Sequence, residues 1–185
     1  IAGLAMLPVL LGLPLLLAPL HIAFLELVID PACSLVFEAE EGANDLMSNP
    51  PRSSREILLS ATQVMQSLSY GALTTLAVFA LHQWMLGQTS SGAASAAAFV
   101  MLVTANAALI LPVRSGSHHR NLALSSLTPT TWWVLSATGA ALLLVTCWPP
   151  LASAFRFETL SMIQWMISIA GGMVLLPLFE GVRRL

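Results

Sequence analysis

Apolar segments about as long as a lipid bilayer is thick recur along this 185-residue chain, and they constrain its fold more than any other feature. A helix needs roughly 20 predominantly apolar residues to cross the hydrocarbon core of a membrane. Runs near that length lie at about 19–37, 57–85, 93–113, 131–150 and 160–181, and polar loops separate them. Only 9% of the residues are charged, whereas a soluble domain carries about 25%. The sequence therefore predicts an all-α, polytopic integral membrane protein.

A shorter apolar segment, residues 1–13, precedes the first of these spans. Pro8 and Pro14 interrupt it before a helix of spanning length can form, and Gly12–Pro14 predicts a short turn. No positively charged segment comes before it, so it does not resemble a signal peptide. Because the chain begins with Ile1 rather than Met, we interpret this segment as the end of a helix from a longer polypeptide. We expect residues 1–185 to form one transmembrane domain with one partial and five complete spans.

The basic residues, all of them arginine, predict how the bundle is oriented. Six of the seven fall on one side of the predicted spans: Arg52, Arg55, Arg114, Arg120, Arg183 and Arg184. Arg156 falls on the other side. Since arginine-rich loops face the cytoplasm, we expect loops 38–56 and 114–130 and the C-terminus to be cytoplasmic, in the cell membrane of a prokaryote. Tryptophans at span ends, Trp84, Trp132, Trp133 and Trp148, fit the aromatic belts found at both membrane interfaces.

Two acidic residues, Glu26 and Asp30, interrupt the apolar stretch HIAFLELVIDPACS at 21–34. Residues four apart lie on the same face of a helix, about one turn from each other. Each charge at the centre of a bilayer costs about 2.5–3.5 kcal/mol even on the lenient insertion scale, and two like charges cost more. The pair is therefore predicted to face the bundle interior and to meet a cation, a proton or water.

Pro31, directly after Asp30, predicts an interruption of the same helix. Proline has no N–H, and its ring clashes with the carbonyl four residues back, which here belongs to Leu27. Unpaired carbonyls at membrane depth occur where they line a cavity or bind a ligand. Carboxylates and backbone carbonyls together suit a hard cation such as Ca²⁺. The alternative is a protonated acid that hydrogen-bonds to a neighbouring helix.

Other polar residues in the spans have simpler interpretations. Asn106, among alanines and valines, is either an interhelical hydrogen-bonding group or a neutral ligand at the edge of a cation site. Ser60, Gln63 and Ser67 form a helical stripe that we expect to hydrogen-bond between helices rather than to line an ion path.

Small and ligand-type residues add packing predictions and no further metal site. Gly139–Ala141 and Gly171–Gly172 predict close helix approach. Cys33 and Cys147 lack metal-type spacing and are expected to be buried thiols. His21 is expected near the outer end of its span, and His118 and His119 are expected to be solvated.

The stretch LGLPLLLAPLHIAFLELVIDPACSLVFEAE, followed by DLMSNPPRSSREILLS, resembles the C-terminal membrane region of type II P-type cation-transporting ATPases, the calcium-pump group. In that family the sixth membrane helix carries a pattern like N-L-V-T-D before a helix break. A cytoplasmic loop with M-x-x-P-P-R follows, and Met47–Arg52 matches it. The proline-containing segment PPLASAFRF between the last two spans also agrees. The resemblance extends from the end of the fifth to the tenth transmembrane helix.

The resemblance implies roles for individual residues. Asp30 takes the position of the central ion-binding aspartate, and Glu26 takes that of an asparagine one turn earlier. Ile29 stands where sarcoplasmic-type pumps have a threonine ligand, while Asn106 and Ile1 stand at positions of acids. The loss of these ligands favours one bound ion instead of two. The expected metal ligands are therefore Asp30 and Glu26, with Asn106 and the Leu27 carbonyl beside them, for a transported cation with Ca²⁺ favoured.

These features predict the ion-translocating part of an ATP-driven cation pump. The chain has no D-K-T-G phosphorylation motif and no nucleotide-binding segment, so ATP, Mg²⁺ and catalysis are expected in cytoplasmic domains elsewhere in the parent polypeptide. The expected partners are those domains, the N-terminal transmembrane helices and the lipid bilayer. No cofactor of this chain and no nucleic acid is expected, since it has no basic cluster. The alternatives are a stand-alone small channel or secondary carrier, and a non-transporting membrane scaffold.

Overall fold

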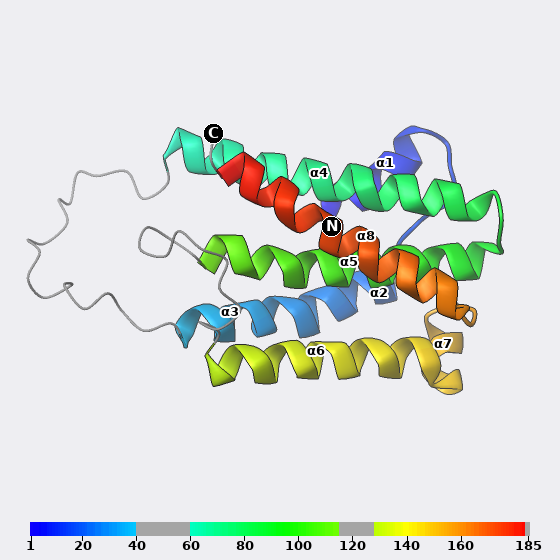
Figure 1. Ribbon diagram of the computed structural model, residues 1–185. Coiled ribbons are helices and arrows are strands. Elements are labelled where there is room, and N and C mark those ends of the chain that lie inside the picture. Colours follow the sequence, from blue (N-terminus) through cyan, green and yellow to red (C-terminus); the bar gives the residue numbers. More distant parts are fainter. Residues whose placement is uncertain (40–59, 115–127, 184–185) are drawn as a thin grey trace, which may run out of the picture.

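The computed structural model describes residues 1–39, 60–114 and 128–183, and every regular element in that part of the chain is helical (Figure 1). The first half contains α1 (Ala2–Leu10), α2 (Pro19–Phe24), the π-helical turn η1 (Leu25–Ile29), α3 (Asp30–Glu38) and α4 (Ala61–Leu86). The second half contains α5 (Ser91–Arg114), α6 (Pro129–Cys147), α7 (Pro149–Ala154) and α8 (Met162–Arg183). The predicted all-α fold is confirmed.

Five helices are long and apolar enough to cross a membrane, and they match the five predicted spans. They cover Pro19–Glu38, Ala61–Leu86, Ser91–Ile110, Pro129–Cys147 and Met162–Val182. The first of them is composite, since α2, η1 and α3 follow one another without a loop. The partial helix predicted at 1–13 is α1, and Gly12 follows it with a φ of 66°, a conformation that glycine adopts easily.

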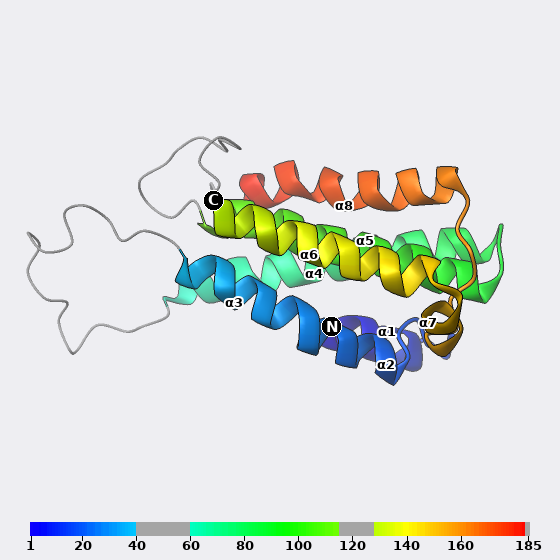
Figure 2. The ribbon, with the colours of Figure 1, turned by 90° about the horizontal axis from the view of Figure 1, so that it is seen from below.

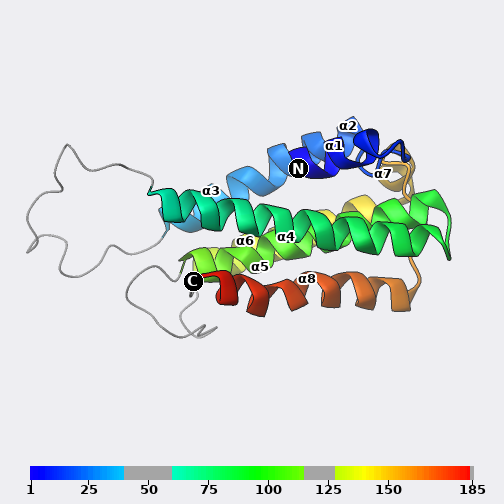
Figure 3. The ribbon, with the colours of Figure 1, turned by 90° about the horizontal axis from the view of Figure 1, so that it is seen from above.

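α5 is the central helix of the bundle. It packs most extensively on α8 and α4, while α3 packs on α6 and α1 packs on α4. Figures 2 and 3 show α8 on one side of the bundle, α1 and α2 on the opposite side, and α5 between them. Its many alanines allow this central position, because small side chains let neighbouring helices approach closely.

Gly172 marks a close contact between α5 and α8. A Cβ added there would lie 2.7 Å from the Thr104 Cβ, and one added at Gly171 would lie 3.2 Å from the Met101 sulfur. The predicted close approach is confirmed at Gly171–Gly172. At Gly139 the prediction is wrong, because a Cβ there would meet no described atom within 4 Å.

Prolines and caps move several helix ends from their predicted positions. α6 ends at Cys147 and not at 150, and the segment PPLASAFRF between the last two spans begins with the short helix α7. Pro149 and Pro150 lie in the first turn of α7, where a missing N–H costs no helical hydrogen bond. α4 begins at Ala61, and the predicted part of this span at 57–59 lies outside the described residues.

The polar stripe at the start of α4 bonds within its own helix. Ser60 and Gln63 form a reciprocal capping box: the Ser60 N–H donates to Gln63 Oε1 at 2.8 Å, and the Gln63 N–H donates to Ser60 Oγ at 3.2 Å. The Ser67 hydroxyl donates to the Gln63 carbonyl at 2.9 Å. The prediction of interhelical hydrogen bonds is therefore wrong for these side chains.

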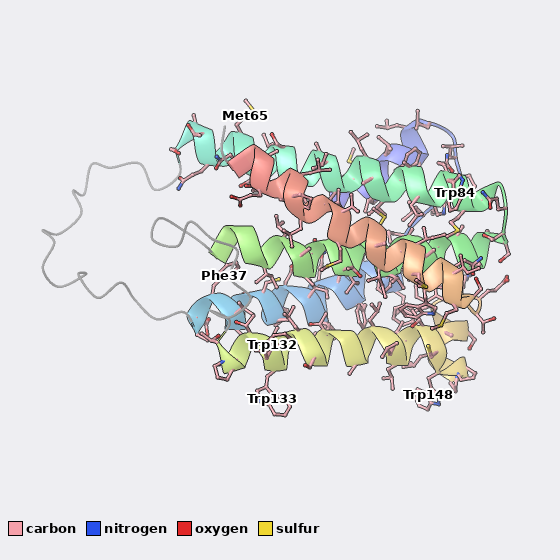
Figure 4. The ribbon with its side chains drawn as sticks, viewed as in Figure 1. Phe37, Met65, Trp84, Trp132, Trp133 and Trp148 are labelled. Carbon is pink, nitrogen blue, oxygen red and sulfur yellow. The ribbon has the colours of Figure 1, made fainter. Side chains whose placement is uncertain are left out.

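The outside of the bundle is apolar, with tryptophans at both ends (Figure 4). Trp132 and Trp133 lie at the beginning of α6, and Trp84 and Trp148 lie at the opposite end of the bundle. All four side chains are exposed on the described chain, as expected for residues at lipid interfaces. Cys147, predicted to be buried, is exposed, whereas Cys33 is half-buried.

Candidate cation site

A cavity of about 330 Å³ lies between α1, α3, α4 and α5. Its polar lining residues are Asp30 and Cys33 from α3, Tyr70, Thr74 and Thr75 from α4, and Asn106 from α5. The rest of the lining includes apolar residues such as Ile29, Leu102 and Ile110. The structure thus brings together Asp30 and Asn106, two of the four predicted ligand residues, from segments far apart in the sequence.

The π-helical turn positions Asp30 at this cavity. The Asp30 N–H donates to the Leu25 carbonyl, five residues back, instead of to the carbonyl of Glu26 as in an α-helix. Pro31 then occupies the first turn of α3, and because α3 continues η1 without a break, its missing N–H leaves out one backbone hydrogen bond of the composite span. The predicted interruption of this span is confirmed, and it takes the form of a widened turn. Single π-helical turns inside α-helices occur often at functional sites.

Asn106 is half-buried on α5, and no described residue forms a hydrogen bond with its amide. The interhelical hydrogen bond, one of its two predicted roles, is not formed within the described part of the chain. An amide that lines a cavity without an internal partner can offer its oxygen to a ligand or to water.

Glu26 and Leu27 lie outside this cavity. Glu26 is exposed on the described chain, as Asp30 is, and the Leu27 side chain is 78% exposed, but neither Glu26 nor Leu27 lines the cavity. The Leu27 carbonyl belongs to the π-helical turn, but Leu27 does not line the cavity. The roles of Glu26 and of the Leu27 carbonyl as cation ligands remain predictions, and so does that of Asp30.

The α4 wall of the cavity was not identified from the sequence. Tyr70 and Thr74 are four residues apart, so they share a helix face, and the Thr74 hydroxyl donates to the Tyr70 carbonyl at 2.9 Å. Thr75 lies against α1, since a Cβ at Gly3 would be 2.9 Å from the Thr75 hydroxyl oxygen. The four-residue spacing of Tyr70 and Thr74 is present in the sequence, but it does not differ from the spacing of the polar residues at 60–67, which do not line the cavity.

α8 carries a second acid that the sequence analysis did not single out. Glu180 is 8% exposed. It follows Phe179, whose ring meets Tyr70 edge-on at 5.4 Å. No group of three or more His, Cys, Asp or Glu residues that could hold a metal ion occurs within the described ranges. The cavity therefore offers one carboxylate together with neutral oxygen donors and the Cys33 thiol.

The fold and this cavity define a polytopic helical membrane protein with a largely apolar cavity that is lined by one carboxylate, Asp30, and several neutral polar side chains. The family model described as "Cation transporting ATPase, C-terminus" matches residues 14–185, and the chain belongs to this family. A comparison with curated proteins found no match. The predicted relationship to the C-terminal membrane region of P-type cation-transporting ATPases is thus confirmed.

Proposed function

We propose that this chain forms part of the intramembrane cation site of an ATP-driven pump, with Asp30 as the central charged ligand. The observation that carries the proposal is the shared cavity: a carboxylate next to a π-helical turn lines the same cavity as a half-buried amide, Asn106. A carboxylate within a membrane span is costly unless something compensates its charge. A transported cation supplies that compensation.

The chemistry of the lining favours a hard cation. Asp30, Asn106, Thr74, Thr75 and Tyr70 offer carboxylate, amide and hydroxyl oxygens, the donors that Ca²⁺ prefers. With one carboxylate in the cavity, we propose that a single ion is bound, with Ca²⁺ favoured, as in the calcium-pump group that the sequence resembles.

Further ligands would come from transmembrane helices outside this chain. Ca²⁺ takes about 6–8 oxygen ligands, and the side chains that line this cavity offer that minimum only if every oxygen on three different helices reaches the same ion. Glu26 is exposed one turn before Asp30, and a charge on that surface should face protein or water rather than lipid. We propose that N-terminal helices of the parent polypeptide cover this surface and bring Glu26 and the Leu27 carbonyl into the site.

The energy source would lie in cytoplasmic domains of the same polypeptide, where ATP and Mg²⁺ would bind. This chain would supply ligands and a helix that can rearrange at η1. We further propose the cell membrane of a prokaryote as its location, with loops 38–56 and 114–130 and the C-terminus in the cytoplasm.

The test is ion-dependent phosphorylation of the full-length protein, measured with Ca²⁺, Mn²⁺, Mg²⁺, Na⁺ and K⁺ in turn. We expect Ca²⁺ to activate most strongly and Asp30→Asn to abolish activation, because the neutral isostere keeps the shape but loses the charge that balances the ion. Glu38→Gln is the matched control, since Glu38 is an exposed acid of the same helix that does not line the cavity. Normal ion activation in Asp30→Asn would refute the site and favour a protonated acid that serves packing.

A further inference from the structure

His21, on the outer half of the composite span, is buried in an aromatic cluster. Its side chain is 3% exposed. The ring centroids of Phe157, Phe99 and Phe155 lie 4.7, 5.5 and 5.6 Å from that of the imidazole. Phe99 belongs to α5, whereas Phe155 and Phe157 belong to the connection between α7 and α8. The imidazole therefore lies where three parts of the bundle meet.

Both ring nitrogens of His21 are hydrogen-bonded to the backbone. The Ala18 N–H donates to Nδ1 at 3.1 Å, and Nε2 lies 2.7 Å from the Phe155 carbonyl oxygen. Because an amide N–H can only donate, Nδ1 carries no proton, and the ring proton is on Nε2, which donates to Phe155. The two hydrogen bonds together require the neutral imidazole.

The acceptor of the second bond is itself held in place. After α7, the Phe157 N–H donates to the Ala152 carbonyl at 2.8 Å and the Arg156 N–H donates to the Ser153 carbonyl at 3.1 Å. This pair of bonds is a Schellman motif, and Arg156 has the left-handed conformation it needs, with a φ of 56°. Glu158 next accepts a 2.6 Å hydrogen bond from the Ser90 hydroxyl, just before α5. His21 thus attaches α2 to a connection that is fixed to α5.

The two halves of the composite span have different neighbours. The outer half, α2, is held by His21, while α3, on the other side of η1, packs on α6. Figure 2 shows α2 and α7 at one end of the bundle and α3 towards the other.

We infer that His21 is a positioning residue: it fixes α2 against α5 and α7, so that the π-helical turn holds Asp30 in register with Asn106. The inference rests on the proposed function, because His21 would act through Asp30.

Two substitutions separate the hydrogen bonds of His21 from its ring packing. His21→Gln keeps an acceptor and a donor on one planar group, whereas His21→Phe keeps an aromatic ring and loses both bonds. Both variants are made in the full-length protein. The readouts are the cation concentration for half-maximal phosphorylation, the maximal phosphorylation level, and hydrogen exchange of the backbone around 15–27.

We expect His21→Phe to raise the half-maximal cation concentration about tenfold, the loss typical when a group that orients a metal ligand is removed. The maximal phosphorylation level should stay the same, and hydrogen exchange around 15–27 should become faster. His21→Gln should resemble the wild type in all three measurements. A purely structural role would lower the yield of folded protein without this selective change in cation requirement.

An unchanged cation requirement in His21→Phe would overturn the inference, even if hydrogen exchange became faster. Equal damage from Gln and Phe would also overturn it, since the hydrogen bonds would then not explain the effect. Asp30→Asn is measured in the same series to separate the two proposals. Activation that survives in Asp30→Asn refutes the proposed site, whereas an unaffected His21→Phe beside an inactive Asp30→Asn refutes the role of His21 alone.

Discussion

Asp30 and Glu26 are one helical turn apart, yet their surroundings differ. Both side chains are exposed on the described chain, but Asp30 lines a cavity with polar groups from α4 and α5, and Glu26 does not. The spacing of four residues predicted a shared face, but it could not tell which acid lies closer to the neighbouring helices. The two side chains should therefore contribute unequally to cation binding.

We predict that Glu26→Gln weakens cation activation of the full-length protein about tenfold, equivalent to about 1.4 kcal/mol. Asp30→Asn should abolish it. The ranking follows from position: Asp30 adjoins the cavity directly, while Glu26 needs helices outside this chain to complete its surroundings. Titration of phosphorylation with the activating cation measures both variants. Equal losses, or a greater loss in Glu26→Gln, would contradict the ranking.

At the scale of the element, η1 explains how a proline is accommodated within the composite span. The turn before Pro31 is widened, so that Asp30 bonds to Leu25 and the chain continues into α3 without an unwound segment. Proline itself predicted an interruption. η1 packs on α5 and α3 packs on α6, and no local sequence pattern describes these contacts.

Pro31→Ala should restore a donor at position 31 and favour regular α-helical bonding through the turn. We expect the side chain of Asp30 to rotate relative to the cavity and the cation affinity to fall about tenfold, with membrane insertion intact. Cation titration and a melting curve in the absence of the cation measure the two effects. Unchanged affinity in this variant would mean that the π-helical turn is not part of the site.

Gly172 allows close packing of α8 against α5, and Gly139 in α6 serves as its control. Gly172→Ala should destabilise the full-length protein by about 1–3 kcal/mol, the usual cost of overpacking, because the new methyl group would overlap Thr104. Gly139→Ala should be tolerated, since no described atom lies within 4 Å of the added Cβ. Thermal melting in lipid nanodiscs compares the two variants. Equal stability would show that α8 can shift without cost.

Span positions could be predicted from the sequence because bilayer thickness sets the length of an apolar helix. The rotation of each helix about its own axis could not be predicted from the sequence, and α4 is an example. Its outward face carries Met65, Leu68 and Leu76, and its inward face carries Tyr70 and Thr74, so hydrophobicity does not separate the two. Asp30 and Asn106 could be identified because a polar group in a span has a physical cost, whereas hydroxyls that bond to their own helix carry little signal.

For the whole molecule, the arrangement of helix ends bears on the predicted orientation. The C-terminal ends of α3, α5 and α8 lie at one end of the bundle, together with the first residues of α4 and α6 (Figure 1). Arg114 and Arg183 are the last residues of α5 and α8, so both belong to this end. α7 lies at the other end, and Arg156 belongs to the connection that directly follows it. The arrangement separates arginine-rich from arginine-poor connections, as the positive-inside rule requires.

Cysteine labelling at the two ends tests which one faces the cytoplasm. Two single-cysteine variants are made in full-length protein whose other cysteines are replaced. One is Ser53→Cys, which lies outside the described residues, and the other is Ser153→Cys, on the exposed surface of α7. We expect a membrane-impermeant maleimide added to intact cells to label position 153 and to leave 53 unreacted. Permeabilised cells should label both, which controls for accessibility. Because an odd number of spans separates the two positions, labelling at 53 alone would invert the bundle and place the arginine-rich end outside. Labelling at both in intact cells would mean that one of the three predicted spans between them, α4, α5 or α6, does not cross the bilayer.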